Sequence, residues 1–399
     1  MSKRASRGRS CKVGLRRGFK IKFMKILIAC DSFKDALNAP DVCKSIERGW
    51  RLADPSVSAT VFPLADGGEG TFDILTAHLS MKNVEMTVND PLFRLIKARY
   101  GLTTEGVAFI EMAQAAGLPL LKNAKRNPLK TSTFGVGELI KNAVKRGANK
   151  IVLGIGGSAT NDGGMGMAAA LGYVFLDKNE KDLEPIGENL IKIHQIVADK
   201  VVFDTSKIKV EVMCDVKNPL FGPTGAAYVY ARQKGATDEM IDLLDKGLQH
   251  FAEKMNGFNC SPFTEGAGAA GGLGFGAMAF LKGELKSGIE VVLDVTNFDK
   301  QLTDKDLVIT GEGRLDAQTA HGKLISGIVQ RAKKANVPVI ALCGALEMTP
   351  QYVADLGLLA AFPIGQKPTN LAEALAATAE NLEKTAFNVA RLFGCMGNT

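Results

Sequence analysis

Residues 24–70 read MKILIACDSFKDALNAPDVCKSIERGWRLADPSVSATVFPLADGGEG and alternate in character along their length. Met24–Cys30 is a mostly apolar run that is typical of a buried strand. Pro40 is suited to the first turn of a helix, and the helical pattern runs to about Ala53. A second strand over Val57–Pro63 leads into the turn at residues 65–70. The order strand, helix, strand predicts a parallel sheet and therefore an α/β fold.

The same alternation returns near the carboxyl end of the chain. Strands are predicted over Asp306–Thr310 and Pro338–Cys343, with a helix over Gly322–Lys334 between them. The middle of the chain differs, because residues 83–112 resemble several strands in succession. We therefore expect residues 24–71 and 289–399 to form one α/β domain. Residues 72–288 are expected to form a second, α/β or α+β, domain inserted into it.

The net charge of +7 on the 399 residues comes from the amino-terminal segment. Residues 1–22 hold nine basic residues and no acidic one, so the rest has 40 basic and 42 acidic residues. A nucleic-acid partner is not expected, because the body of the chain carries no basic excess. We predict that residues 1–23 are a disordered or non-native extension.

The cysteine spacing and the hydropathy pattern indicate where in the cell the protein is expected. None of the seven cysteines forms a C-x-x-C pair, which argues against a zinc site or a disulfide framework. The longest uncharged Gly/Ala-rich stretch, residues 266–281, is shorter than the ~18–20 apolar residues of a membrane span. We expect a cytoplasmic protein with no membrane partner.

Four glycine-rich segments carry the chemistry: Asp66–Gly70, Gly154–Gly166, Gly266–Gly276 and Thr310–Thr319. Glycine lets backbone N–H groups approach an anion closely, so such loops are typical of phosphate sites. The third segment has no polar side chain, and its glycines are equally consistent with close packing of a helix on a strand.

The second glycine segment also fits a different function. Gly154–Ala159 matches G-x-G-x-x-A after a strand, and Asp177 follows about 20 residues later, as in a dinucleotide-binding fingerprint. An NAD-dependent dehydrogenase of a small hydroxy acid is therefore an alternative. The polar residues Thr160–Asp162 argue against it, because they stand where the packed first turn of the helix should be.

Acidic and basic side chains accompany the glycines. Carboxylates that hold Mg²⁺, N–H groups and cations around phosphates are the parts that phosphoryl transfer requires. The residues themselves thus indicate an ATP-dependent phosphotransferase, with a non-catalytic nucleotide-binding module as a further alternative.

The combination of motifs resembles the glycerate kinase family of the bacterial two-domain type, from about Met24 to Leu392. The motifs that carry the resemblance are residues 31–34 (DSFK), 65–70 (ADGGEG), 110–113 (IEMA), 126–129 (RNPL), 154–164, 214–216 (CDV), 218–220 (NPL), 233–236 (QKGA), 266–276, 310–319 and 321–323 (HGK). The family lacks an extension like residues 1–23.

The resemblance implies a fold, a reaction and a site. The fold would be a flavodoxin-like or Rossmann-like domain formed by both chain ends, with the second domain inserted. The reaction would convert ATP and D-glycerate into ADP and phosphoglycerate with Mg²⁺, in the cleft between the domains. We favour the 2-phosphate product and leave the 3-phosphate open. A homodimer is a further expectation.

Residue roles follow from placing these motifs in that reaction. Catalytic candidates are Asp66, Asp162, Lys34 and Arg314, with Asp66 and Asp162 competing for the general base. Substrate-binding candidates are Asp31, Ser32, Lys34, Glu69, Lys234 and His321. Nucleotide-binding candidates are Gly156, Gly157, Ser158, Thr160, Asn161, Gly268, Gly271 and Gly272. Metal-binding candidates are Glu312, Asp316 and Asp215.

Overall fold

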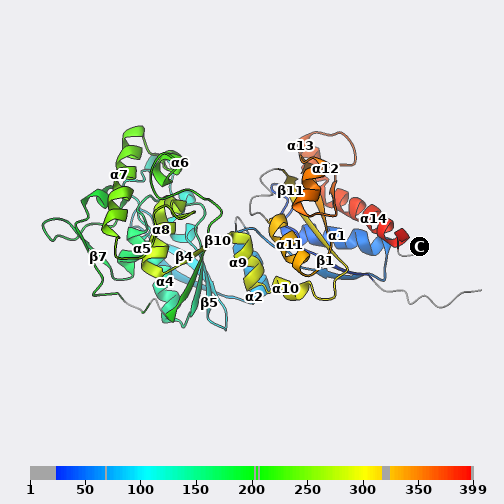
Figure 1. The fold of residues 1–399 in the computed structure, drawn as a ribbon, viewed down its shortest axis with the longest axis horizontal. Coiled ribbons are helices and arrows are strands. Elements are labelled where there is room, and N and C mark those ends of the chain that lie inside the picture. The colour runs from blue at the N-terminus through cyan, green and yellow to red at the C-terminus, as the bar shows by residue number, and fades with distance from the viewer. Residues whose placement is uncertain (1–23, 68–69, 202–203, 205–206, 317–323, 397–399) are drawn as a thin grey trace, which may run out of the picture.

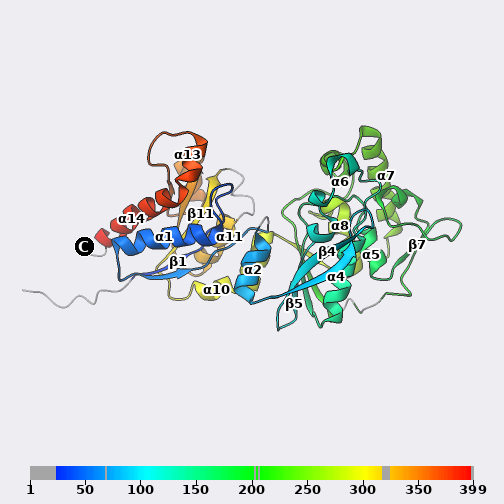
Figure 2. The same ribbon diagram turned by 180° about the vertical axis from the view of Figure 1, so that it is seen from behind.

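The computed structural model describes residues 24–67, 70–201, 204, 207–316 and 324–396, and its elements gather around two sheets (Figures 1 and 2). The extension 1–23 and the predicted site residues Glu69 and His321 lie outside the described residues.

The first sheet is built from both ends of the chain. Its five strands are β1 (Lys25–Ile28), β2 (Ser58–Val61), β11 (Leu307–Leu315), β12 (Val339–Leu346) and β13 (Ala360–Pro363). They pair in parallel in the order β2-β1-β11-β12-β13. Numbered within this sheet alone, the order is 2-1-3-4-5, which is the flavodoxin-like arrangement. The predicted fold class is confirmed.

Helices cover both faces of this sheet (Figure 1). They are α1 (Ala39–Ala53), α11 (Leu324–Lys334), α12 (Pro350–Leu356), α13 (Leu371–Ala376) and α14 (Thr378–Met396). Helix α1 begins as its sequence predicts: Asn38 accepts a hydrogen bond from the Asp41 N–H, and Pro40 lies in the first turn. Its buried Trp50 face packs beside α14, where a side chain on Gly49 would lie 2.2 Å from the Glu383 carbonyl oxygen.

The second sheet is mixed and comes from the middle of the chain. Its strands are β3 (Lys82–Asn89), β4 (Leu95–Leu102), β5 (Val107–Glu111), β6 (Lys150–Gly154), β9 (Lys209–Met213) and β10 (Glu284–Lys286). The order is β10-β9-β6-β5-β4-β3. Pairing is antiparallel from β3 to β5 and parallel from β5 to β10, so both kinds of strand pairing occur in this sheet.

The remaining elements surround this second sheet. Its larger helices are α4 (Phe134–Lys145), α7 (Asp238–Lys254) and α8 (Ala269–Leu281). Shorter segments are α3 (Ala113–Ala116), α5 (Met165–Ala170), α6 (Ala226–Tyr230) and the 3₁₀ turns Leu118–Leu120, Asn123–Lys125, Gly187–Lys192 and Arg232–Lys234. Strands β7 (Val174–Leu176) and β8 (Gln195–Val197) form a separate two-stranded ribbon.

Helices α2 (Thr71–Leu79) and α9 (Gly288–Val295) lie between the two sheets, and α10 (Phe298–Gln301) follows α9 (Figures 1 and 2). One apolar cluster contains Leu27 of the first sheet, Met213 of the second and Ile289 of α9. The ring of Phe72 in α2 lies 5.9 Å from that of Phe109 in β5, measured between centroids. Both linking helices share this core, so the domain boundaries at 71/72 and 288/289 stay a prediction.

Strand β11 corrects one sequence-based expectation. The fourth glycine segment was expected to be a loop from Thr310 onward, yet the strand continues to Leu315. Gly311 pairs with Leu342 and Arg314 with Ala345, so β12 pairs with the described part of this segment up to Leu315, and residues 317–319 lie outside the described residues. The glycines there allow close approach of the two strands, since a side chain on Gly311 would lie 2.4 Å from the Leu342 carbonyl oxygen.

The carboxyl end of the chain forms two helices in succession. Asn370 caps the short α13, because its side chain accepts a hydrogen bond from the Glu373 N–H at 2.9 Å. Helix α14 follows after Ala377. No helix within the described ranges is both long and apolar enough to cross a membrane.

Candidate active site

Acidic residues gather where the strands of the first sheet end. Asp31 follows β1, and its N–H donates to the Gly311 carbonyl oxygen at 2.9 Å. Both the N–H and the hydroxyl of Ser32 donate to the Asp31 carboxylate, at 2.6 and 3.3 Å. Burial and, after it, the negative charge of Asp66 raise the pKa of Asp31 to about 7, with a further contribution from Glu312. This is the point between β1 and β11 where the strand order reverses, which is where open α/β sheets bind ligands.

The second sheet contributes an acid to the same place. Asp215 follows β9, and its carboxylate accepts a hydrogen bond from the Gly288 N–H at 2.8 Å. Burial raises the pKa of Asp215, and the charge of Asp66 adds to the rise. The chain segments that carry Asp66 and Gly288 pack directly on each other: a side chain on Gly288 would lie 2.3 Å from the Asp66 carbonyl oxygen. The carboxyl ends of the two sheets are therefore close at Asp66 and Asp215.

The predicted metal ligands lie at these strand ends. Glu312 is on β11 beside Asp31, Asp316 follows β11, and Asp215 stands at the end of β9. Within the part of the chain that the structure describes, no three His, Cys, Asp or Glu side chains are close enough together to hold a metal ion. Mg²⁺ commonly takes only one or two protein carboxylates and completes its shell with water and phosphate, so these donors suit it chemically.

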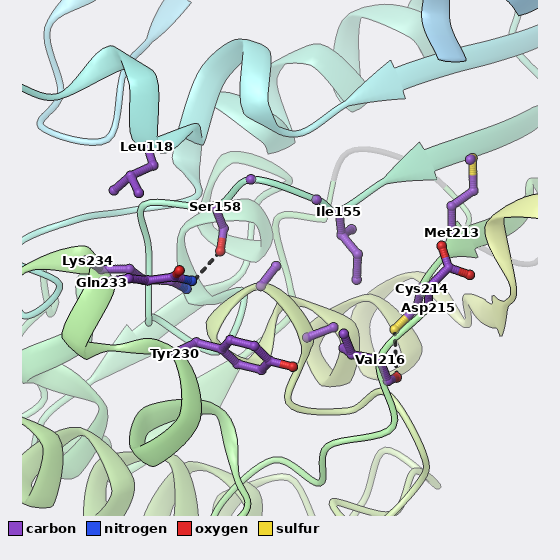
Figure 3. A pocket seen from close by; sticks show the side chains of 14 residues that line it. Leu118, Ile155, Ser158, Met213, Cys214, Asp215, Val216, Tyr230, Gln233 and Lys234 are labelled. Atoms are coloured by element: carbon purple, nitrogen blue, oxygen red, sulfur yellow. Dashed lines mark hydrogen bonds between the residues drawn. The ribbon is translucent and has the colours of Figure 1, made fainter. Parts of the chain in front are cut away.

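A pocket of about 250 Å³ adjoins Asp215, between the ends of β6 and β9 (Figure 3). It gathers five predicted site residues: Gly156, Gly157, Ser158, Lys234 and Asp215. Gly156 and Gly157 are exposed, so their backbone is accessible from the pocket. A glycine loop and a cation at the carboxyl end of parallel strands are suited to binding an anion.

Lys234 holds the glycine loop in place. Its ammonium group donates to the Ser158 hydroxyl at 2.8 Å and to the Thr160 carbonyl oxygen at 2.7 Å (Figure 3). The side chain is 2% exposed. Burial lowers the pKa of Lys234 to about 7, although the charge of Asp162 acts in the opposite direction. Lys234 therefore stabilises the glycine loop through its two hydrogen bonds, and it also places a titratable amine beside the pocket.

Asp162 lies in the interior. Its carboxylate accepts hydrogen bonds from the Thr133 N–H and hydroxyl, both at 2.7 Å, and from the N–H groups of Gly164 and Gly166 at 3.3 and 3.1 Å. Burial raises the pKa of Asp162, and these hydrogen bonds offset part of the rise. The two contacts from Thr133 tie the second glycine segment to the start of α4, and the two from Gly164 and Gly166 fix the turn within the segment itself, so the surroundings of Asp162 are those of a structural carboxylate.

The third glycine segment supports the second from behind. A side chain on Gly271 would lie 2.0 Å from the Thr160 carbonyl oxygen, and one on Gly268 would lie 2.1 Å from that of Pro219. Gly271 and Gly272 have φ of +68° and +90°, a region open to glycine. Thr160 and Asn161 are fully buried. These five predicted nucleotide-binding residues lie behind the residues that line the pocket, and their contact with nucleotide stays a prediction.

The dinucleotide-binding fingerprint is wrong. Strand β6 ends at Gly154, whereas α5 begins only at Met165, so no helix starts within the glycine turn. Asp177 lies in the β7–β8 ribbon and accepts hydrogen bonds from the N–H groups of Asn179 and Lys181, at 2.7 and 3.0 Å. The carboxylate is thus engaged in its own turn.

Two predicted cations lie at the carboxyl edge of the first sheet. Lys34 is exposed, and its backbone lies next to Gly313 of β11. Arg314 projects from β11 with its Nε 3.6 Å from Glu347 Oε1. Both side chains are accessible, as a site for an anionic substrate requires.

Several residues that line the pocket were not predicted as site residues from the sequence. Tyr230, Gln233, Cys214 and Ala270 all line the pocket. Gln233 and Cys214 each adjoin a predicted site residue within motifs quoted above, so the signal was present. Tyr230 had no such signal, because its place depends on how α6 packs beside the glycine loop.

Comparisons with known proteins identify the family of the chain. A family model described as the glycerate kinase family matches residues 26–394. The chain belongs to the glycerate kinase family. A glycerate kinase of Bacillus cereus is 45% identical over 93% of this chain and 98% of its own length. The glycerate 2-kinase of Escherichia coli is 41% identical over 92% of this chain and 97% of its own.

A solved structure extends the likeness to the fold. The crystal structure described as glycerate kinase 2 of Salmonella typhimurium has a TM-score of 0.85 and 41% identity, over 94% of this chain and all of its own. This glycerate kinase family member is thus a kinase, and the dehydrogenase and non-catalytic alternatives are wrong.

Proposed function

We propose that the protein transfers the terminal phosphoryl group of ATP to D-glycerate where the carboxyl ends of its two sheets meet. The position of Asp215 carries this proposal. Asp215 lines the pocket of the second sheet. The negative charge of Asp66, which follows β2 of the first sheet, contributes to the raised pKa of Asp215. A ligand in the pocket would therefore end beside the acidic residues Asp31, Asp66 and Glu312.

The pocket supports a role in nucleotide binding. The loop of Gly156 and Gly157 offers accessible backbone N–H groups to phosphate oxygens, and Ser158 adds a hydroxyl. Lys234 fixes the loop through its two hydrogen bonds, so the donors are arranged before the nucleotide binds. Preorganised donors of this kind supply much of the catalysis in phosphoryl transfer.

The first sheet would then bind the acceptor. Lys34 and Arg314 are the accessible cations at its carboxyl edge and would bind the glycerate carboxylate. Asp31 and Ser32 would hydrogen-bond its hydroxyl groups. Of the two candidates for general base, Asp66 lies at the meeting point of the sheets, whereas Asp162 is buried among structural donors. We assign the base to Asp66.

Mg²⁺ fits the donors at this place. The charges of Asp66 and Glu312 destabilise ionised Asp31, which is the repulsion that a divalent cation would relieve. Asp215, Glu312 and Asp316 are the residues that would hold the ion. When bound, Mg²⁺ neutralises charge on the phosphate oxygens.

We favour the 2-hydroxyl as the acceptor. The support is the Escherichia coli relative, whose name is glycerate 2-kinase and which covers almost the same length. The test is direct: the purified protein is incubated with D-glycerate, ATP and Mg²⁺, and the product is identified by phosphorus-31 NMR. A resonance of 2-phosphoglycerate is expected. Only 3-phosphoglycerate would overturn the regiochemistry, and no glycerate-dependent ADP would overturn the function.

A further inference from the structure

The pocket beside Asp215 has an apolar side as well as an anion-binding one. Its apolar lining comes from six side chains: Leu118, Ile155, Met213, Val216, Ala269 and Ala270. Tyr230 adds an aromatic ring, which extends across the lower part of the pocket in Figure 3. A site for phosphates alone would not need this lining, because phosphates are bound by N–H groups, hydroxyls and cations.

Tyr230 is held so that its ring stays in the pocket. Its hydroxyl donates to the Asn218 side-chain oxygen at 2.6 Å, and the Asn218 amide donates to the Thr224 carbonyl oxygen at 2.8 Å. The polar tip of the tyrosine is thus engaged by Asn218, while the residue as a whole lines the pocket and stays partly exposed. Aromatic rings fixed in this way are typical stacking platforms for nucleobases.

Ala270 holds a strained backbone in the apolar wall. Its φ of 54° and ψ of 38° lie in the left-handed region, as do those of the two glycines that follow it. An alanine in this conformation is strained by about 1 kcal/mol relative to glycine. Ten described non-glycine residues have a positive φ, and Ala270 is the one among them that lines this pocket, where such strain can serve a ligand site.

The positions of the lining residues indicate which way a nucleotide would lie in the pocket. Gln233 and Lys234 lie at one end of the pocket and Asp215 at the other, with Tyr230 below them (Figure 3). The phosphoryl group to be transferred must lie near Asp215, because the acidic residues of the first sheet adjoin it. The opposite end is therefore the place for the part of the ligand farthest from the reaction. Gln233 is exposed there and could pair with the polar edge of a purine.

We propose that this pocket binds the nucleoside end of ATP, with the Tyr230 ring and the Ala270 methyl group as the walls that contact the base. The inference rests on the proposed function and adds the residues that select the nucleotide. The pocket is smaller than the ~300–1,000 Å³ that enclose a drug-sized ligand. It is therefore suited to one part of a nucleotide, with the phosphates continuing along the glycine loop toward Asp215.

The test is the binding of ADP, measured by calorimetry without turnover. Tyr230→Leu is expected to weaken ADP binding about tenfold, because a stacked base is worth roughly 1–3 kcal/mol. Tyr230→Phe keeps the ring and should bind ADP like the wild type. Tyr228→Leu is the matched control: it lies on the same helix, outside the pocket lining, with its hydroxyl bonded to Asp242.

A second variant guards against misfolding of the first. Ala270→Gly relieves the strained backbone, so it should fold at least as well as the wild type, yet it removes one methyl group from the wall. We expect ADP binding to weaken about threefold, the scale of one buried methyl group. The KM for glycerate should not change in either variant.

Three results would overturn the inference. ADP binding that is unchanged in Tyr230→Leu would exclude the ring, and equal weakening in Tyr230→Phe would assign the effect to the hydroxyl. An increase in the KM for glycerate with unchanged ADP affinity would place the acceptor in the pocket instead. These results are separate from failure of the proposed function, which would appear as a wild-type protein that binds ADP but forms no phosphoglycerate.

Discussion

Two aspartates that looked equivalent in the sequence occupy opposite environments. Asp162 is fully buried and accepts four hydrogen bonds, whereas Asp66 lies among acidic residues at the ends of both sheets. Asp162→Asn would turn an amide N–H group toward donors that need an acceptor. We expect it to lower the free energy of unfolding by about 2–3 kcal/mol, the range for losing bonds to a buried charge. Denaturant titration measures this.

Asp66→Asn should lower activity and leave stability nearly unchanged. If Asp66 takes the proton of the glycerate hydroxyl, the change removes the base without disturbing a core, so kcat should fall about 100-fold or more. Its unfolding midpoint should stay near that of the wild type. Steady-state kinetics and denaturant titration of both variants together decide the assignment. A stable but inactive Asp162→Asn beside an active Asp66→Asn would reverse it.

Lys234 predicts a pH dependence of stability. Its pKa is about 7 in the folded protein, against roughly 10.4 for an unperturbed lysine. Between these values the unfolded chain binds one proton more than the folded one, so this residue makes stability rise with pH from about 7 to 10. As the pH falls from about 10 to 7 this stability is lost, because the buried side chain stays neutral while the unfolded chain takes up a proton; below pH 7 both states are protonated and the contribution no longer changes.

The measurement compares the wild type with Lys234→Met. The difference in unfolding free energy between the two proteins should increase from pH 7 to pH 9 in favour of the wild type. Other titrating groups, Asp31 among them, are common to both proteins and cancel in the difference. A difference that stays constant over this range would mean that Lys234 is charged in the folded protein throughout.

Among the elements, the kinked start of α8 is the one on which the pocket wall depends. Gly271 has φ +68°, and a side chain there would lie 2.0 Å from the Thr160 carbonyl oxygen and 2.6 Å from the Asn161 Cα. Gly271→Ala should therefore destabilise the protein, because the steric clash and the positive φ outweigh the reduced flexibility of the unfolded chain. It should also weaken ADP binding by displacing the glycine loop. Thermal unfolding and calorimetry report the two effects.

Gly154→Ala is the control for this prediction. It lies at the end of β6, next to the same loop, but a side chain there would come no closer than 3.8 Å to any neighbour. We expect its melting temperature to stay close to that of the wild type. Equal destabilisation by both substitutions would show that the region tolerates no alanine, whatever the space around it.

Elements could be predicted where their signals are local. Pro40 gave the start of α1, and apolar runs gave β1 and β6. The carboxyl end of β11 could not be predicted from its own sequence, because Gly311 and Gly313 are typical of a loop. Their place in a strand follows only from the pairing of β11 with β12. A side chain on Gly344 of β12 would lie 2.5 Å from the Gly313 carbonyl oxygen. These glycines permit close strand contact, a purpose that the sequence of one strand does not reveal.

At the scale of the molecule, the sequence indicated that Asp31 follows a strand but not which acids lie close to it. Asp31 follows β1 of the first sheet and Asp215 follows β9 of the second, so each lies at the carboxyl edge of its own sheet. That Asp66 meets Asp215 depends on the packing of Gly67 against Gly288, two residues 221 positions apart in the chain. The burial of Asp162 depends likewise on α4. Contacts of this range are set by the tertiary fold.

The amino-terminal segment gives the last prediction. The family model begins its match at residue 26, and residues 1–22 hold nine basic residues without an acidic one. We expect a segment with so much like charge and no regular apolar spacing not to contribute to a core. Deleting residues 1–23 should therefore leave kcat and the melting temperature unchanged.

The same deletion should change the behaviour of the protein toward charged surfaces. It converts a formal net charge of +7 into −2, so the truncated protein should lose its retention on a cation exchanger at neutral pH and low salt. The full chain is the control under identical conditions. A fall of several degrees in the melting temperature on truncation would contradict the prediction, because it would require the basic segment to make contacts that its composition does not support.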